Sequence, residues 1–204
     1  MKIICIGRNY ADHIAELRNE TPAAPVIFLK PDTALLQRGQ PFFYPAFSQD
    51  IHHEIELVLR ICKNGRHIEE QFAATYFDAI GLGIDFTARD VQNQLKAKGL
   101  PWELAKGFDG AAPISPIFRL VAGFADLANI NFHLDVNGET RQTGNSGLML
   151  HPFAQILVFV SQYITLKQGD LIFTGTPAGV GPVSIGDQLT GYLEGEKLLE
   201  VAVK

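Results

Sequence analysis

The sequence is poor in cysteine, with only Cys5 and Cys62 among its 204 residues. Each lies in an apolar run that is typical of a strand. We therefore predict two buried free thiols rather than a disulfide or a pair of metal ligands.

The chain also lacks an excess of positive charge and any long apolar run. Its formal net charge is -5, and no polybasic stretch is present. This argues against nucleic acid as the main partner and leaves a local cation site to attract anionic substrates. The apolar part of residues 1–7 is too short for a signal peptide and has no cleavage pattern. We therefore predict a cytoplasmic protein that neither is secreted nor spans a membrane.

No low-complexity tract, internal repeat or Gly/Ser linker divides the chain, so residues 1–204 are predicted to form one domain. Strands are expected at residues 2–6, 26–30, 51–59, 79–84, 131–136, 171–174, 188–193 and 197–203, with a return strand that begins at Arg141. Helices are expected at residues 10–17, 69–77, 87–98 and 151–163. Strands and helices do not alternate regularly. A strand-rich α+β fold, with a mixed sheet bent into a barrel or roll, therefore fits better than a doubly wound fold.

Three connections carry their own signals. The pairs Asn64-Gly65 and Asn137-Gly138 each suit a tight hairpin turn. Residues 18–25 form a polar, proline-bearing stretch that we interpret as a mobile loop. Together with the expected helix before it, this loop makes residues 10–25 a candidate lid.

Glu54 and Glu56 stand one residue apart inside the apolar run 51–59. On a strand they would share one face with His52, while Ile55, Leu57 and Leu59 line the other face. Two carboxylates on a partly buried face repel each other, and a hard divalent ion with oxygen ligands relieves that repulsion. The alternative is an edge strand with a solvated acidic face.

Asp85 ends the apolar run 79–84 at the point where the next helix is expected to begin. Its carboxylate could cap that helix, although Thr87 is an equally plausible cap. With Glu54 and Glu56, Asp85 could instead complete a three-carboxylate site for magnesium or manganese.

Four further residues are candidates for chemistry. Lys106 is flanked by Trp, Phe, Ala and Gly, so its amine could clamp a substrate carboxylate or stabilise an enolate; the alternative is a lysine that reaches solvent. The glycine-rich loop 174–182 would let the Thr176 hydroxyl approach a carboxylate. His13 and Glu16 are three apart on the expected first helix and could form a catalytic dyad, or simply a solvated pair.

Several blocks of sequence together carry a resemblance to a known family. They are Gly7-Arg8-Asn9-Tyr10 with His13 and Glu16, Phe28-Leu29-Lys30-Pro31, His53-Glu54-Ile55-Glu56-Leu57, residues 85–92, residues 98–106, and Thr174-Gly175-Thr176-Pro177. Read in order, they resemble the fumarylacetoacetate hydrolase family, nearest to its small acylpyruvase and oxaloacetate decarboxylase branch. One segment departs from the family pattern: residues 146–151 replace the usual Thr-x-x-Met followed by a β-branched residue and Phe.

The resemblance implies a β-roll fold, a homodimer, and a magnesium or manganese ion held by Glu54, Glu56 and Asp85. It also implies substrate contacts from Lys30, Arg89, Gln92, Lys106 and Thr176. In the acylpyruvase branch the His-x-x-Glu pair lies on a lid over bound ligand, which here corresponds to His13 and Glu16 within residues 10–25.

The function predicted first is hydrolysis of the C–C bond of acylpyruvates through a metal-bound pyruvate enolate. His13 with Glu16 would activate water, and Lys106 would stabilise the developing charge. Oxaloacetate decarboxylation, oxaloacetate keto–enol tautomerisation and 2-hydroxyhepta-2,4-diene-1,7-dioate isomerisation are alternatives on the same site. A calcium-stabilised ligand-binding module is the non-enzymatic alternative. The expected partner is a small 2-oxo acid.

Overall fold

The structure, a computed structural model, describes residues 1–17, 20–116, 118–121, 123 and 127–204. Within these ranges the largest sheet has six strands, of which β1 and β10 are parallel and all other neighbours antiparallel. In spatial order they are β2 (Val26–Lys30), β1 (Ile3–Gly7), β10 (Leu171–Phe173), β4 (Ile55–Ile61), β5 (Phe77–Ile84) and β7 (Arg119–Leu120). The predicted mixed sheet is therefore confirmed.

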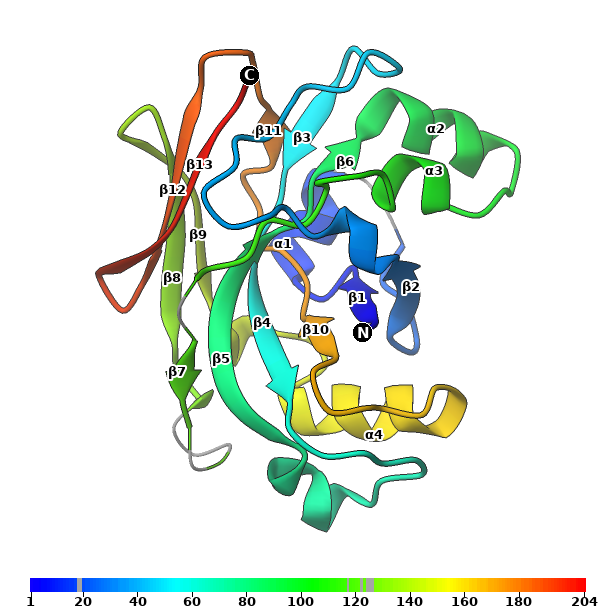
Figure 1. The fold of residues 1–204 in the computed structure, drawn as a ribbon. Helices are drawn as coiled ribbons and strands as arrows, with labels where there is room; N and C mark the ends of the chain where they lie inside the picture. The colour runs from blue at the N-terminus through cyan, green and yellow to red at the C-terminus, as the bar shows by residue number, and fades with distance from the viewer. Residues whose placement is uncertain (18–19, 117, 122, 124–126) are drawn as a thin grey trace.

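A second sheet stacks against the middle of the first (Figure 1). It contains four antiparallel strands in the described residues, in the order β13 (Glu196–Ala202), β12 (Gln188–Leu193), β8 (Asn131–Val136) and β9 (Glu139–Asn145). The two sheets approach closely at Gly191, where an added Cβ would lie 3.2 Å from Leu82 and 3.3 Å from Ile55. The result is a strand-rich α+β roll, with no closed barrel among the described strands.

The predicted hairpin between β8 and β9 is present. Asn137 and Gly138 both have positive φ angles, 55° and 81°, as a two-residue turn between right-twisted strands requires. The return strand begins at Glu139, two residues before the predicted start.

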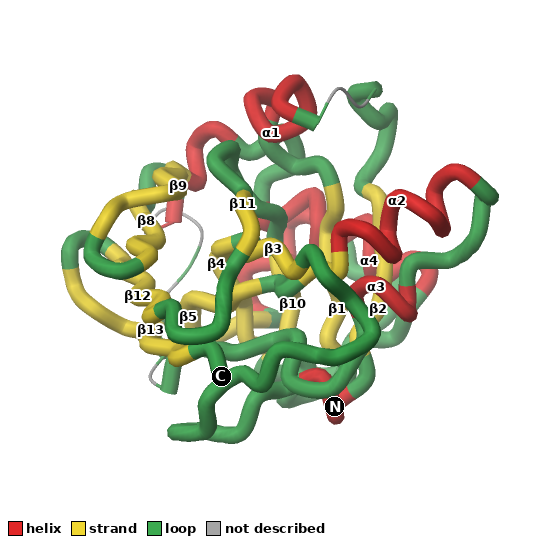
Figure 2. The backbone as a smooth tube through the Cα atoms, turned by 90° about the horizontal axis from the view of Figure 1, so that it is seen from above, coloured by secondary structure: helices red, strands yellow, loops and turns green. Residues whose placement is uncertain are grey.

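The four α-helices of the described residues lie outside these sheets. They are α1 (Ala11–Glu16), α2 (Arg89–Ala97), α3 (Glu103–Lys106) and α4 (Phe153–Tyr163), with 3-10 helices η1 (Asp32–Ala34), η2 (Glu70–Thr75) and η4 (Ser146–Leu148). Figure 2 shows α2 and α3 together on one flank of the strands, opposite the four-stranded sheet. No helix in the described ranges is long and apolar enough to cross a bilayer.

Two local predictions were wrong. Gly65 does not form a tight turn: it pairs with Leu166, and β4 pairs with β5 across residues 62–76. A glycine is needed there because an added Cβ would lie 2.2 Å from the Tyr76 ring. Cys62 follows the end of β4 and is only half-buried, whereas Cys5 is fully buried; both thiols are free. The helix predicted at residues 69–77 is present as the 3-10 helix η2.

The predicted helix at residues 87–98 begins later than expected. Thr87 and Ala88 form β6 (Thr87–Ala88), which pairs with β3 (Ile51–His53). β3 also pairs with β11 (Gly181–Pro182), which makes a small third sheet beside the start of α2.

Candidate active site

The predicted strand at residues 51–59 is broken at Glu54, and this break builds the site. β3 ends at His53 and β4 begins at Ile55, so the two pieces join different sheets. At the break, the carbonyl of Glu54 accepts a hydrogen bond of 2.8 Å from the amide of Asp85. The end of β5 is thereby fixed beside the start of β4.

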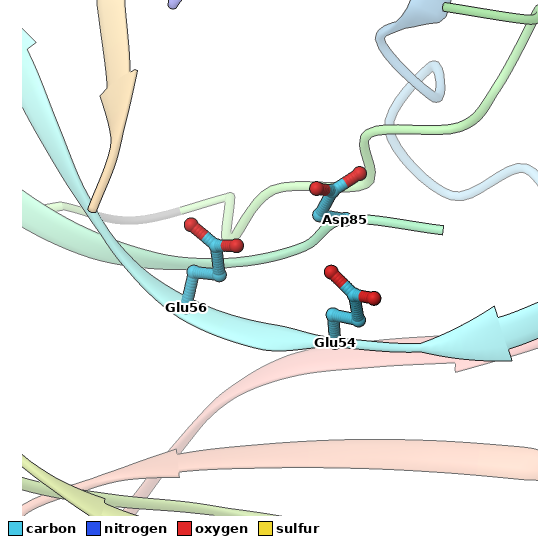
Figure 3. A group of neighbouring side chains, drawn as sticks. All are labelled: Glu54, Glu56 and Asp85. Atoms are coloured by element: carbon cyan, nitrogen blue, oxygen red, sulfur yellow. The ribbon is translucent and has the colours of Figure 1, made fainter. Parts of the chain in front are cut away.

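Three carboxylates converge at this junction (Figure 3). Glu56 lies opposite Gly83 in the β4–β5 register, and Asp85 follows the end of β5. One oxygen from each of Glu54, Glu56 and Asp85 lies within 4.8 Å of the other two, and all three side chains are buried. The structure thus brings together the three residues that the sequence proposed as metal ligands.

Three cations hold two of these carboxylates. Lys106 donates from Nζ to Glu54 Oε2 at 2.8 Å and to Asp85 Oδ2 at 2.6 Å. Arg89 donates to Glu54 Oε1 at 2.5 Å, and Lys30 Nζ lies 2.7 Å from Asp85 Oδ1. Burial acts to lower the pKa of Lys106, but Asp85 and Glu54 outweigh it and leave that pKa raised. The Lys106 amine is therefore charged at neutral pH.

Glu56 is the carboxylate without a cation partner among the described residues. Its side chain accepts a 2.7 Å hydrogen bond from the amide of Gly175. Burial raises its pKa well above the ordinary value, and the neighbouring Asp85 and Glu54 raise it further. A buried carboxylate in this state is stabilised by an added cation.

The donor set fits a divalent metal. Three carboxylates at the end of a pocket are the hard oxygen ligands that magnesium and manganese take, and such ions keep further positions for water or substrate. The raised pKa shows that the ionised form of Glu56 is disfavoured in this site, and an ion there would stabilise that ionised form.

A pocket opens directly from these carboxylates, and its walls are strongly basic. Its polar lining residues are Arg8, His13, Glu54, Glu56, Asp85, Arg89, Gln92, Lys96, Lys106 and Thr176, and its apolar lining includes Ile6, Leu17, Phe28 and Trp102. Five of the residues that the sequence proposed for substrate or catalysis line this pocket: His13, Arg89, Gln92, Lys106 and Thr176. The other two, Glu16 and Lys30, each contact a residue that lines it. Lys30 lies behind Asp85, fully buried, with its amine also bonded to the carbonyls of Phe86 and Ala111.

His13 and Glu16 form the predicted pair on α1. His13 Nδ1 lies 3.3 Å from Glu16 Oε2, and the amide of Gly179 donates to both Glu16 oxygens at 3.1 and 3.3 Å. Burial lowers the pKa of His13 in spite of the nearby Glu54 and Glu16. His13 is therefore a neutral imidazole at pH 7, able to accept a proton. Residues 18 and 19 of the predicted loop lie outside the described residues.

Thr176 and Gln92 are both held by other protein groups at the pocket wall. The Thr176 hydroxyl donates to the carbonyl of Ile55 at 2.8 Å and accepts from Gln142 Nε2 at 2.8 Å. Gln92 accepts from Arg89 Nη1 at 2.7 Å. Gln92 thus orients the guanidinium that grips Glu54.

Gln142 is a residue that reasoning from the sequence missed. Its amide is buried and fully bonded: the oxygen accepts from His53 Nδ1 and the amide of Ile55, and the nitrogen donates to Thr176 and to the carbonyl of Pro177. It ties the start of β4 to the loop after β10. The available signal was its place at an inward position of the alternating run 139–145.

Thr87 was considered only as a helix cap, yet its hydroxyl accepts a 2.5 Å hydrogen bond from Lys106. Arg8 and Lys96 also line the pocket. Arg8 was named only as part of the block Gly7-Arg8-Asn9-Tyr10, with no role assigned to it, and Lys96 was not singled out. No spacing in the sequence marks either side chain as part of a site.

Comparison with known proteins agrees with this geometry. Residues 2–203 match the family described as fumarylacetoacetate (FAA) hydrolase C-terminal. The chain belongs to the fumarylacetoacetate hydrolase family. The predicted resemblance is therefore confirmed over nearly the whole sequence.

Three relatives are informative among family members. The chain is 44% identical over 193 residues to oxaloacetate tautomerase FAHD1, mitochondrial, of Bos taurus, covering 95% of this chain and 87% of the relative. It is 44% identical over 186 residues to oxaloacetate decarboxylase, mitochondrial, of Dictyostelium discoideum, covering 91% of this chain and 85% of the relative. The crystal structure of fumarylpyruvate hydrolase from Pseudomonas aeruginosa, in complex with Mn2+ and pyruvate, superposes with a TM-score of 0.93 at 34% identity, covering 100% of this chain and 89% of that one.

Proposed function

We propose that this protein is a divalent-metal-dependent oxaloacetate keto–enol tautomerase. The observation that carries the proposal is the buried group of three carboxylates at the end of a pocket whose walls are basic. The similarity to a named oxaloacetate tautomerase over 95% of the chain supports it. We therefore reverse the order given by the sequence, which placed acylpyruvate hydrolysis first.

Glu54, Glu56 and Asp85 would hold the ion, which we take to be magnesium or manganese. When bound, such an ion supplies Lewis acidity toward the 2-oxo oxygen and carboxylate of the substrate. Arg89 and Gln92 keep Glu54 oriented, and Lys30 keeps Asp85 oriented.

Tautomerisation moves one proton between C3 and the 2-oxo oxygen. His13 lines the pocket, is neutral, and is oriented by Glu16, so it is the group that accepts the proton from C3. The charged amine of Lys106 stabilises the negative charge that develops on the oxygen. That oxygen then takes up the proton that His13 accepted, which gives the enol and returns His13 to its neutral form. Thr176 and Phe28 complete the wall around the substrate.

Acylpyruvate hydrolysis is the second candidate, and the His13–Glu16 pair favours it. A base that is oriented by a carboxylate, itself fixed by the Gly179 amide, is the arrangement that activates a water molecule. The likeness to a fumarylpyruvate hydrolase supports this candidate.

The deciding experiment follows the enol form of oxaloacetate in parallel with pyruvate release from oxaloacetate and from acetylpyruvate. Each reaction is run with magnesium, with manganese and with chelator. We expect metal-dependent tautomerisation that far exceeds both kinds of pyruvate release and that is lost in His13→Ala. Fast cleavage of acetylpyruvate with negligible tautomerisation would establish the hydrolase instead. Preferential calcium binding without any turnover would favour the ligand-binding module.

The homodimer, the lid at residues 10–25 and the cytoplasmic location stay predictions. For the dimer, the exposed Phe43 and Phe47 offer an apolar patch, and sedimentation equilibrium tests it. For the lid, the bond from Gly179 to Glu16 gives α1 a closed position, and hydrogen exchange with and without oxalate tests it.

A further inference from the structure

Two basic side chains in the pocket wall have no task in the reaction described above. Arg8 follows β1, and Lys96 lies in the last turn of α2. Both line the pocket that contains the carboxylates, yet neither forms an ion pair with any residue that the structure describes. Lys30, Arg89 and Lys106 differ, because each of them contacts a carboxylate of the site.

The backbone fixes Arg8 in an unusual conformation. Its φ angle is +59°, in the left-handed region that residues other than glycine rarely adopt. The next residue, Asn9, is fully buried and bonds through its side chain to the carbonyls of Thr174 and His151 and to the amide of His151. Such strain persists where surrounding contacts enforce it, and it gathers at functional sites.

The guanidinium of Arg8 is also incompletely bonded. Its Nε is buried and has no hydrogen-bond partner among the described residues. A buried N–H donor without a partner costs free energy, and a ligand that accepts from it recovers that cost.

Lys96 reaches the same space from α2. Arg89, Gln92 and Lys96 are spaced i, i+3 and i+7, so they share one face of the helix. Helical side chains lean toward the N-terminus, which directs Lys96 back toward Arg89 and the carboxylates. Its amine lies over the Trp102 ring, 5.4 Å from the centroid.

Arg8 and Lys96 are close enough to repel each other. Burial lowers the pKa of Lys96 to about 8, and the positive charges of Arg89 and Arg8 contribute to the shift. Glu54 acts on Lys96 in the opposite direction but does not offset the shift, and Glu54 is already bound by Arg89 and Lys106. Two cations gathered in a partly buried wall are stabilised further by an added anion. A carboxylate suits both, since the guanidinium offers paired donors and the ammonium a compact charge.

We propose that Arg8 and Lys96 form a subsite for the second carboxylate of a 2-oxo dicarboxylic acid. The inference rests on the proposed function, because it takes the 2-oxo end of the same substrate to lie at Glu54, Glu56 and Asp85. The subsite selects oxaloacetate over acetylpyruvate, which has a similar length but carries a methyl ketone in place of the second carboxylate.

The test compares the binding of these two ligands by calorimetry, in magnesium and in a His13→Ala background that removes the proposed base. Arg8→Met and Lys96→Met each delete one charge and keep an unbranched side chain. Lys98→Met is the matched control, because Lys98 is exposed and does not line the pocket. We expect each pocket variant to weaken oxaloacetate binding at least about tenfold and acetylpyruvate binding less than about twofold. The control should change neither.

Equal weakening of both ligands, or no change in either, would overturn the subsite. So would a parent protein that binds oxaloacetate no more tightly than acetylpyruvate, even if it proved to be a tautomerase. If oxaloacetate instead binds through Arg8 and Lys96 but the unmodified enzyme turns over none of the substrates, the proposed function fails and the subsite stands. The unfolding temperature of each variant shows whether it is folded. If Arg8→Met does not fold, the binding data for Lys96→Met, whose substitution lies on a helix surface, decide the test.

Discussion

Glu54 and Glu56 look alike in the sequence, but glutamine should destabilise the metal-free protein at position 54 and leave its stability nearly unchanged at position 56. From the sequence alone, Glu54→Gln is expected to relieve the repulsion between the two carboxylates. In the structure Glu54 is bound by Arg89 and Lys106, whereas Glu56, within the described part of the chain, accepts a hydrogen bond only from the amide of Gly175. The loss of Glu54 therefore leaves two buried cations short of a partner, and the loss of Glu56 leaves none.

Removing one partner of a buried ion pair lowers the free energy of unfolding by about 3–5 kcal/mol in general. Because Lys106 keeps Asp85 as a partner, we expect Glu54→Gln to lower it by the smaller amount, about 3 kcal/mol. For a chain of this length that lowers the unfolding temperature by about 6–12 °C. Glu56→Gln retains an acceptor for Gly175 and should change stability by less than about 0.5 kcal/mol, or about 1–2 °C.

Magnesium distinguishes the loss of a metal ligand from the loss of an ion pair. At about one hundred times its dissociation constant, a bound ion stabilises the parent protein by about 2.7 kcal/mol, or about 5–11 °C. Both variants lose a ligand and should lose this increase. Thermal unfolding by circular dichroism, with chelator and with a magnesium series, measures both quantities. Equal unfolding temperatures of the two variants without metal would contradict this prediction. So would a Glu56→Gln variant whose unfolding temperature rises with magnesium as much as that of the parent.

Two further predictions concern the groups around the carboxylates. Gln142→Leu removes four buried hydrogen bonds and should lower the free energy of unfolding by about 3 kcal/mol. KM should rise more than kcat falls, because Thr176 loses the hydrogen bond that holds it at the pocket wall. An unchanged urea midpoint would contradict the stability prediction. Burial lowers the pKa of His13 from 6.5, so the neutral base form predominates at pH 7 and activity should fall only as the pH drops below 6.5. Because Glu16 raises this pKa, Glu16→Gln should move the acid limb of the pH–rate profile to lower pH, and a shift to higher pH would refute the role of His13.

Much of the fold could be predicted where periodicity and turn chemistry act locally. The alternation at residues 131–136 and the Asn137-Gly138 turn specify a hairpin without reference to the rest of the chain. Asn64-Gly65 shows the same local signal, but there the packing of Tyr76 over Gly65 decides the conformation. The break at Glu54 could not be predicted either, because it depends on a hydrogen bond to Asp85, 31 residues away.

The carboxylates could be found in the sequence because charges in an apolar run are conspicuous. Their partners could not, because a cation is recognised as a partner only after the chain has folded. Lys106 stands 21 residues from Asp85 and 52 from Glu54 along the chain, yet it donates to both. Sequence spacing therefore showed which residues repel each other and gave no information on which cations offset that repulsion.

The difference in cation partners determines which substitution can test the metal site. Three carboxylates that are equivalent as metal donors become inequivalent through their partners. Among the residues that the structure describes, Glu54 has two cations, Asp85 has two, and Glu56 has none. A loss of activity in any glutamine variant would be consistent with a metal site, and equally with a collapsed network of ion pairs. Only Glu56 separates these explanations, because its replacement removes a proposed ligand while every ion pair in the site remains.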